Sequence, residues 1–357
     1  MVAIYVTSAE TFAGKSAVCV GLAMRFSQDG IRFGYMKPVS RAARPVAGQT
    51  TDPDVAFIKE TFSLPEPHEL LNPVALTPQF EEAILRGEVQ MDFAGRIQEA
   101  YHQLAQGREV MLLEAGTNLR EGFLIGLPAY RLADILGARE LVVARYADNL
   151  LDDVLAAREI LGDTMLGVVI NAVPRPYLGH VSDVLQPYLE RHHVPVLGIL
   201  PEDQLLQSLD VRELAEVVEG RVLCCEDALD QLVEHFMIGA MSVDSALAYF
   251  RLKPNKAVIT GGDRADIQLA ALETSTRCLV LTGNLYPSTV ILERAKNVGV
   301  PIVLSKYDTM STVARIYQYF GKTRFHQRKK LARFMELMQE RFDFARLYAL
   351  AGLQKPA

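Results

Sequence analysis

The residues with the clearest chemical signature are 9–16, which read Ala-Glu-Thr-Phe-Ala-Gly-Lys-Ser. Their spacing matches the P-loop pattern G-x-x-x-x-G-K-[ST], with Ala9 at the first glycine position. An apolar run precedes this segment and another follows it at residues 17–26, so we expect a loop between a buried strand and a helix. The free N–H groups at the start of such a helix attract phosphate. The pattern therefore predicts a site for the triphosphate of ATP or GTP, with Mg²⁺.

Individual roles follow from the residue types in this loop. Gly14 allows close approach of the backbone to phosphate, Lys15 reaches the β- and γ-phosphates, and Ser16 can ligate Mg²⁺. Ala9 is tolerable only if its φ is negative. The predicted nucleotide-binding residues of the loop and the helix start are Thr11, Ala13, Gly14, Lys15, Ser16 and Ala17.

Other polar residues stand where neighbouring strands end. Glu114 closes the run Val-Met-Leu-Leu-Glu, the place of an acid near Mg²⁺ in this class of site. Lys37 follows the next apolar run and would point into the same crevice. Asp52 and Asp54 lie in the following loop, where either could be a Mg²⁺ ligand or an ordinary helix cap. We predict Ser16, Asp54 and Glu114 as the metal ligands and Lys15 and Lys37 as catalytic residues.

Hydrophobic periodicity predicts the elements that position these residues. Short β-branched runs alternate with amphipathic segments, which is typical of an α/β fold with a parallel sheet covered by helices. The expected strands of the first domain are Ala3–Thr7, Phe33–Lys37, Val110–Glu114, Glu140–Ala144, Leu166–Asn171 and Val196–Ile199. Residues 44–80, rich in Pro and Thr, are expected to form a long loop and a short helix.

A composition shift near residues 201–210 marks the expected domain boundary. A second βα series follows, with expected strands Arg221–Cys225, Ala257–Thr260, Cys278–Thr282 and Ile302–Ser305. The sequence thus predicts a P-loop domain at 1–205, a smaller α/β domain at 212–323, and a C-terminal segment at 324–357.

The C-terminal segment is expected to form one amphipathic helix over residues 324–350. Its apolar stripe consists of Leu331, Phe334, Met338, Phe342 and Ala345. Such a stripe must be buried, either on its own chain or on a second subunit. The second alternative leads us to predict a homo-oligomer, most simply a two-fold dimer.

Composition narrows the class of protein. Hydrophobic residues make up 50% and charged residues 22% of the 357 residues, as in globular proteins with substantial cores. The net charge of −6 argues against nucleic acid as a partner. No apolar run is long enough to cross a membrane, and no basic leader precedes the first apolar run. Four cysteines without metal-ligand spacing predict buried reduced thiols and a cytoplasmic protein.

Taken together, the first 205 residues resemble dethiobiotin synthetase and its relatives. The resemblance rests on Gly14-Lys15-Ser16, Lys37-Pro38-Val39, Asp54 and Glu114-Ala115-Gly116. It extends to Gly167-Val168-Val169-Ile170-Asn171, which matches the strand ending in an adenine-contacting Asn, and to the last strand at residues 194–201. The resemblance implies ATP and Mg²⁺ as cofactors, Asn171 as a nucleotide contact, and a dimer.

The second half resembles a DRTGG domain, through residues 259–267, 281–283 and 306–309. The name motif departs here, because Ala265 stands where Thr is usual and the following Gly-Gly is missing. A dethiobiotin-synthetase-like domain followed by a DRTGG domain is the arrangement of the N-terminal region of long bacterial phosphate acetyltransferases. The resemblance implies a nucleotide-sensing regulatory role, with an enzyme of acetyl-phosphate metabolism as a possible partner. It implies no acetyl transfer, because the catalytic domain is not expected in these 357 residues.

Two functions therefore compete. The first is a regulatory ATP-binding protein, and the second is an ATP-dependent ligase in which Lys37 holds a carboxylate or carbamate while Lys15 stabilises charge on the transferred phosphoryl group. Weak ATP hydrolysis fits either function. Glutamine-dependent amidation is not expected, because none of the cysteines has a nucleophile-like setting. A partitioning ATPase is disfavoured, because Ala9 and Glu10 stand where a second loop lysine would be expected.

Overall fold

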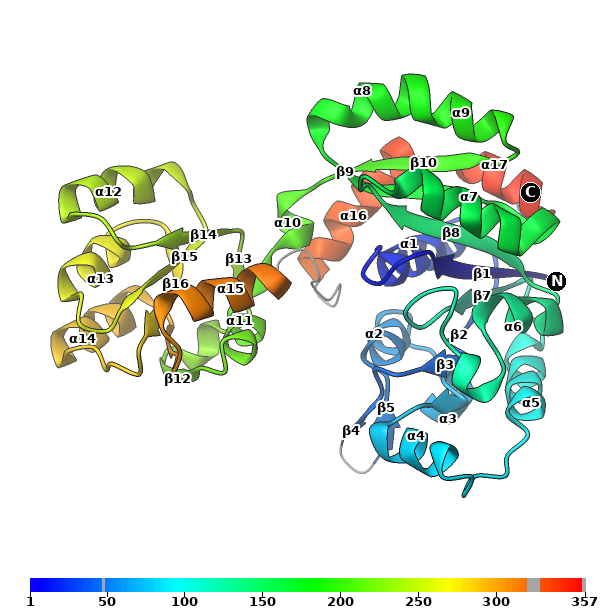
Figure 1. Ribbon diagram of the computed structural model, residues 1–357, viewed down its shortest axis with the longest axis horizontal. Helices are drawn as coiled ribbons and strands as arrows, with labels where there is room; N and C mark the ends of the chain where they lie inside the picture. Colours follow the sequence, from blue (N-terminus) through cyan, green and yellow to red (C-terminus); the bar gives the residue numbers. More distant parts are fainter. Residues whose placement is uncertain (47–48, 320–327, 355–357) are drawn as a thin grey trace. The chain divides into compact units, whose positions relative to one another are not determined.

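The computed structural model describes residues 1–46, 49–319 and 328–354, and the chain forms two compact units (Figure 1). The first unit comprises Met1–Glu202 together with Phe325–Ala357, and the second comprises Asp203–Arg324. The C-terminal segment thus belongs to the P-loop unit, and the second unit is inserted between its last strand and its last helices.

A six-stranded, all-parallel sheet forms the centre of the first unit. Its strand order is β10-β9-β8-β1-β7-β2, so the order reverses on either side of the first strand. The strands are β1 (Val2–Ser8), β2 (Phe33–Met36), β7 (Val110–Glu114), β8 (Arg139–Arg145), β9 (Met165–Val173) and β10 (Val196–Pro201). All six expected strands are present, with ends within two residues of the prediction.

Helices cover both faces of this sheet (Figure 1), as expected where the order of parallel strands reverses. They are α1 (Lys15–Gln28), α5 (Phe93–Ala105), α6 (Ala129–Leu136), α7 (Leu150–Leu161), α8 (Leu178–His180) and α9 (Gln186–Arg191). The region at 44–80 holds more structure than one short helix. It contains α2 (Pro53–Thr61), α3 (His68–Leu71) and the start of α4 (Pro78–Leu85). It also contains the short strands β4 (Arg44–Val46), β5 (Gln49–Thr51) and β6 (Val74–Ala75), and β3 (Val39–Ser40) lies just before it.

The predicted single C-terminal helix is wrong: the structure has α16 (Arg328–Arg341) and α17 (Phe344–Ala351), and residues 324–327 lie outside the described residues. The break has a local cause. Asp343 caps α17 through the N–H of Arg346, while its own N–H bonds to the carbonyl of Leu197 on β10. Phe342 forms a bridge to Gly198, so this point of the chain is attached to the sheet edge.

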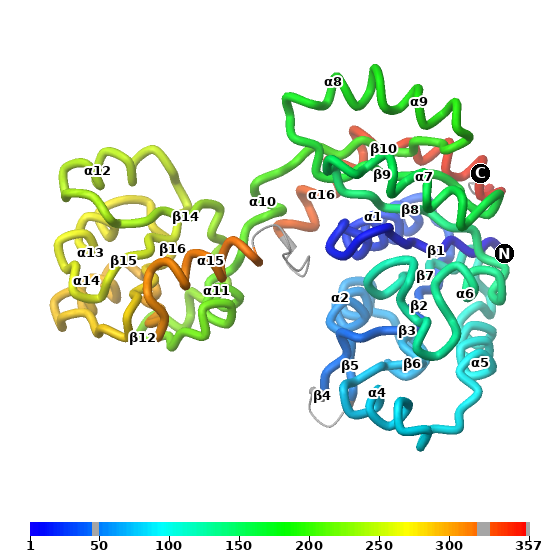
Figure 2. Tube along the Cα trace, viewed as in Figure 1, coloured from blue at the N-terminus to red at the C-terminus, as the bar shows by residue number. Residues whose placement is uncertain are grey.

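The apolar stripe of α16 is buried on its own chain. Phe334 and Met338 pack over Gly21 of α1, where an added Cβ would come within 3.4 Å of both side chains. In Figure 2 the C-terminal segment lies beside α1 and β10, and α16 contacts both of these elements. Ala345, predicted on the same stripe, is exposed because the stripe does not continue through the break. A second subunit is therefore not needed to cover this face.

The second unit is built on a five-stranded sheet of order β12-β17-β16-β15-β14. The strands are β12 (Arg221–Cys224), β14 (His235–Ile238), β15 (Lys256–Gly261), β16 (Thr276–Thr282) and β17 (Ile302–Leu304). A short pair, β11 (Leu209–Asp210) with β13 (Leu232–Val233), adds to it. Its helices are α10 (Gln204–Gln207), α11 (Val211–Val217), α12 (Val243–Leu252), α13 (Ala265–Leu272), α14 (Thr289–Val298) and α15 (Thr309–Tyr319).

Two features of this sheet differ from the expectation. The edge strand β12 runs antiparallel to β17, whereas a simple βα series implied parallel strands. The opposite edge strand, β14, was not predicted, because its residues are half-buried or exposed and lack the continuous apolar run of the central strands. Gly262 follows β15, and an added Cβ there would collide with the carbonyl of Leu285.

No helix among the described residues has the length and apolar character required to cross a bilayer. All four cysteines are free thiols. Three of them are buried as expected, and Cys225 is half-buried.

One buried acid gives the first unit a testable pH dependence. Glu140 on β8 is 1% exposed, and neither carboxylate oxygen has a hydrogen-bond partner among the described residues. Burial raises the pKa of Glu140 from 4.5 to about 7, and the nearby Thr164 only partly opposes this rise. Between these two values the unfolded chain loses this proton while the folded chain keeps it. Stability should therefore fall by up to about 3 kcal/mol as pH rises through this window.

We expect Glu140→Gln to remove that loss, so that urea denaturation gives a more stable protein at pH 8 and a flatter profile between pH 5 and 8. Glu159→Gln, at an exposed position on α7, is the control and should retain the wild-type profile. A wild-type profile in Glu140→Gln would show that the carboxylate is not held neutral.

Candidate nucleotide-binding site

The loop after β1 has the geometry of a phosphate-binding loop. Gly14 has φ +101° and is the N-cap of α1, and no side chain caps that helix. The N–H groups of its first turn therefore have no intrahelical acceptor and no side-chain partner at the cap. Ala9 is not among the residues with positive φ, as its methyl group requires, whereas Phe12 is, with φ +59°.

A side chain also lies close to Gly14. An added Cβ would lie 2.3 Å from Nδ2 of Asn171, which donates a hydrogen bond of 2.8 Å to the carbonyl of Ala13. Asn171 lies near the end of β9, so the sheet holds the loop from the side. The side-chain amide of Asn171 thus contacts the backbone of the loop itself.

Lys15 is 6% exposed, and its Nζ donates to the carbonyl of Thr117 at 2.6 Å and to Oγ of Ser8 at 3.1 Å. Burial lowers the pKa of Lys15, and the charge of Glu114 opposes that shift. Its present acceptors are neutral oxygens. Phosphate oxygens are stronger partners for an ammonium group, because charge-assisted hydrogen bonds have about twice the strength of neutral ones.

Glu114 connects the loop to the next strand. Its Oε1 accepts from Oγ of Ser16 at 2.6 Å, and its Oε2 accepts from the hydroxyl of Tyr35 at 2.7 Å. The carboxyl is fully buried, and burial raises its pKa, while Lys37 opposes the rise. A divalent cation at this carboxylate would favour its ionised form.

Lys37 is held among acids at the carboxyl end of β2. Its Nζ lies 2.6 Å from Asp54, 3.1 Å from Asp52 and 4.0 Å from Glu114, and the side chain is 3% exposed. Burial by itself would lower the pKa of Lys37, but Asp54, Glu114 and Asp52 together raise it well above its usual value. The ammonium group therefore stays charged.

The two loop aspartates have different positions. Asp52 caps α2 by accepting hydrogen bonds from the N–H groups of Asp54 and Val55, and it is buried against Ser40. Of the two roles that the sequence allowed for this residue, Mg²⁺ ligand or helix cap, the structure shows the helix cap. Asp54 is more exposed, with 23% of its side chain accessible. It is the aspartate of this pair with access to solvent and hence to an ion.

The remaining predicted residues lie around the loop. Thr11 is exposed at its tip, Ala13 is buried beneath it, and Ala17 lies in the first turn of α1. Among the described residues, no group of three or more His, Cys, Asp and Glu side chains forms a metal site. A Mg²⁺ ion held with a nucleotide needs fewer protein ligands, because it keeps several waters and binds phosphate oxygens. Of the three predicted ligands, Ser16 and Glu114 are joined by a hydrogen bond of 2.6 Å, whereas Asp54 is bound to Lys37.

The sequence analysis missed the residues that orient the predicted ones. Ser8 and Thr117 hold Lys15, and Tyr35 holds Glu114. Tyr35 and Lys37 are two residues apart at the end of β2, so strand alternation could have placed them on one face. Thr117 contacts Lys15 only through its backbone carbonyl, and a backbone contact cannot be predicted from the type of residue.

Comparison with known families agrees with this architecture. The AAA domain family matches residues 2–209, more than half of the chain, and the DRTGG domain matches residues 213–319. The chain belongs to the AAA domain family, with a DRTGG domain following the P-loop domain.

Several characterised proteins are similar over long stretches. The phosphate acetyltransferases of Synechocystis sp. and Nitratidesulfovibrio vulgaris are 26% and 24% identical, each over 96% of this chain and 51% of the relative. The ATP-dependent dethiobiotin synthetase BioD of Pseudomonas aeruginosa is 28% identical over 56% of this chain and 90% of its own length. The chain spans about half the length of the phosphate acetyltransferases that it matches.

Two solved structures show a remote likeness to parts of this chain. The CBS and DRTGG domains of a Clostridium perfringens pyrophosphatase, complexed with diadenosine tetraphosphate, match 39% of this chain and 69% of that one, at 20% identity and a TM-score of 0.27. The septum site-determining protein MinD of Pyrococcus horikoshii, complexed with Mg-ADP, matches 57% of this chain and 83% of that one, at 15% identity and a TM-score of 0.33. Scores this low carry no weight for function.

Proposed function

We propose that the first unit binds ATP with Mg²⁺ at the loop of residues 9–16, and that the chain is a nucleotide-sensing regulatory protein. The observation that carries the proposal is the uncapped start of α1 beside the buried Lys15 and the Ser16–Glu114 pair. In this proposal the first-turn N–H groups and Lys15 hold the phosphates. Ser16, Glu114 and Asp54 hold the ion, which neutralises phosphate charge when bound. Asn171 contacts the nucleotide base, as the family resemblance implies.

The regulatory assignment is supported by the similarity to phosphate acetyltransferases, which extends over nearly the whole chain and through both domains. We propose an enzyme of acetyl-phosphate metabolism as the protein partner. Measuring the affinity of a purified phosphate acetyltransferase for this chain, with and without ATP–Mg²⁺, tests that partner. Equal, negligible binding in both conditions would contradict it.

The alternative is an ATP-dependent ligase of the dethiobiotin synthetase type, with Lys37 as the group that holds a carboxylate or carbamate. One observation disfavours it. The ammonium of Lys37 is buried and lies within 4.0 Å of three carboxylates, so a substrate would have to displace Asp54 or Asp52 to reach it. Phosphate release should be measured with ATP alone and with 7,8-diaminopelargonate and bicarbonate added. Turnover only with these substrates would favour the ligase.

Glu114→Gln tests the metal site. The amide keeps the shape of the side chain but removes its charge, so we expect the Mg²⁺-dependent part of ATP affinity to fall by about tenfold. The melting temperature should change little, and Glu159→Gln should leave both properties unchanged. Unchanged ATP affinity per folded molecule, together with a lowered melting temperature, would make Glu114 a structural acid.

Oligomerisation stays a prediction that rests on the family resemblance, because the stripe that motivated it is buried within the chain. We expect a two-fold dimer in light scattering of the full chain. A monomer at every concentration would contradict it.

A further inference from the structure

A buried acid, Glu121, closes the turn that follows β7. Its Oε2 accepts a hydrogen bond from the N–H of Thr117, and its own N–H donates to the carbonyl of Asn118 at 3.2 Å. Only 8% of Glu121 is exposed. The carboxylate lies against the backbone of Gly116, where an added Cβ would collide with both oxygens. Residues 116–121 therefore form a compact turn that encloses this carboxylate.

The same turn is attached to β1. The N–H of Leu119 donates to the carbonyl of Ser8 at 2.9 Å, and the N–H of Ala115 donates to the carbonyl of Val6 at 2.9 Å. The backbone is thus fixed on both sides of Thr117, and the buried carboxylate fixes the N–H of Thr117 itself. Because these three bonds hold the turn, the carbonyl of Thr117 has a defined direction.

That carbonyl is the nearest acceptor of the P-loop lysine. Nζ of Lys15 lies 2.6 Å from the carbonyl oxygen of Thr117 and 3.1 Å from Oγ of Ser8. An ammonium group has three donors, so two acceptors leave one donor for a ligand. In the proposed complex, Lys15 can therefore keep its bond to Thr117 while it donates to a phosphate oxygen.

We propose that Glu121 is a positioning residue for Lys15: its carboxylate fixes Thr117, and the carbonyl of Thr117 fixes the ammonium group. The inference rests on the proposed function, because it concerns the same lysine and the same nucleotide. A long side chain that is already held in place loses less conformational entropy when it binds phosphate. Glu121 thus favours nucleotide binding without touching the nucleotide.

A double-mutant cycle with Lys15→Ala tests the inference, with ATP–Mg²⁺ titrated into the full chain by calorimetry. With Lys15 present, Glu121→Ala should weaken ATP binding about fivefold, the loss expected for one hydrogen bond. In Lys15→Ala protein the same change should alter the affinity by less than about twofold, because no ammonium group remains to be positioned. A purely structural role of Glu121 would give the same loss in both backgrounds.

Two further variants separate this hydrogen bond from other effects. Glu121→Gln keeps an acceptor for Thr117, and the amide group replaces Oε1, an oxygen without a hydrogen-bond partner among the described residues. Its ATP affinity should stay within about twofold of wild type. Gly116→Ala places a methyl group where the carboxylate lies, so it should weaken ATP binding as Glu121→Ala does.

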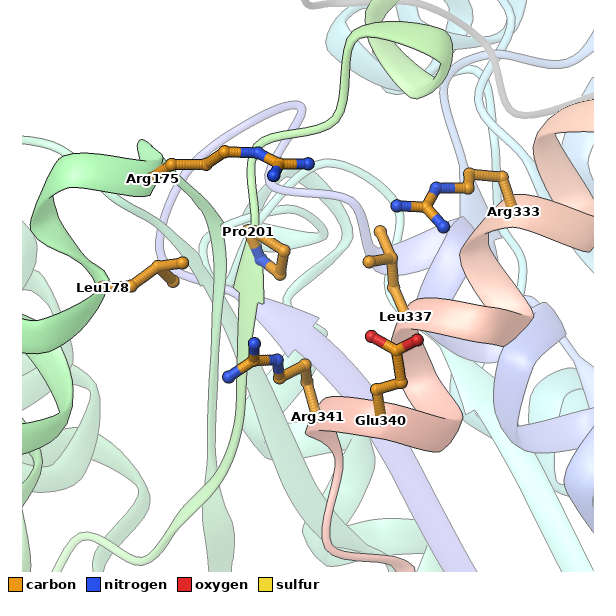
Figure 3. Close-up of a pocket in the computed structure, with 7 residues that line it drawn as sticks. All are labelled: Arg175, Leu178, Pro201, Arg333, Leu337, Glu340 and Arg341. Carbon is orange, nitrogen blue, oxygen red and sulfur yellow. The ribbon is translucent and has the colours of Figure 1, made fainter.

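Glu340→Ala is the matched control. This glutamate lines a cavity of about 330 Å³ beside the end of β10 (Figure 3), and no residue of the turn lines that cavity. Its removal should leave ATP affinity within about twofold of wild type. Thermal melting of every variant allows the affinities to be compared per folded molecule.

Hydrogen exchange of the Thr117 amide checks the first step without a ligand. We expect slow exchange in the wild type and in Glu121→Gln, and fast exchange in Glu121→Ala. Equally fast exchange in all three would overturn the inference, as would equal losses of ATP affinity in the two Lys15 backgrounds.

A third contrary result is ATP binding by Glu121→Gln as weak as that of Glu121→Ala, which would make the carboxylate a direct ligand of the ion. Absence of ATP binding by the wild type would contradict the proposed function, and this role of Glu121 with it. ATP binding by the wild type together with any of the contrary results above would contradict the role of Glu121 alone.

Discussion

Lys15→Ala should bind ATP–Mg²⁺ at least about tenfold more weakly than the wild type, with the fold unchanged. The buried ammonium group donates to Thr117 and Ser8, and in the proposed complex it donates to phosphate oxygens. Charge-assisted hydrogen bonds of this kind contribute about 1.5–3 kcal/mol, which corresponds to roughly 10- to 150-fold in affinity.

The measurement is calorimetry on both proteins in the same buffer. Lys253→Ala, at an exposed position in the second unit, is the control and should bind as the wild type does. Equal ATP affinity in wild type and Lys15→Ala would remove the loop from the binding site.

Truncation of the chain after residue 327 should prevent the first unit from folding stably. This change removes α16 and α17, whose side chains Phe334, Met338 and Leu347 are at most 2% exposed. Each contributes about 1.5–3 kcal/mol by burial, and a domain is stable by only about 5–15 kcal/mol. The truncated protein should aggregate or lose its cooperative thermal transition.

Truncation after residue 354 is the matched control and should melt as the full chain does. A point variant, Phe334→Ala, should lower stability by about 3–5 kcal/mol without removing the helix. If the chain ending at residue 327 retained the wild-type melting temperature and ATP affinity, the C-terminal helices would have no structural role in this unit.

The central strands were predictable because they are buried on both faces and read as continuous apolar runs, such as Val110–Leu113. The break in the C-terminal helix was not predictable, because the apolar spacing in the sequence continues past Phe342 to Ala345. Its interruption depends on a tertiary bond between Asp343 and β10, which local periodicity does not contain. The edge strand β14 was missed for the opposite reason, since its side chains are too exposed to give a clear pattern.

The residues of the candidate site were predictable where the P-loop pattern and the carboxyl ends of the strands lie together. Lys15, Ser16, Lys37 and Glu114 lie together because parallel strands end at one edge of the sheet. The distinction between Asp52 and Asp54 was not predictable from residue type. It depends on which aspartate caps α2, and hence on where that helix begins.

The most direct measurement is calorimetric titration of the full chain with ATP, in Mg²⁺ and then in excess EDTA, with GTP as a competitor to establish base preference. The proposed site predicts one bound nucleotide per chain with micromolar affinity, and a marked loss of affinity without Mg²⁺, because Ser16, Glu114 and Asp54 would then have no ion to bind. No detectable heat with either nucleotide in Mg²⁺, from protein that melts cooperatively, would contradict the assignment of this loop as a nucleotide site.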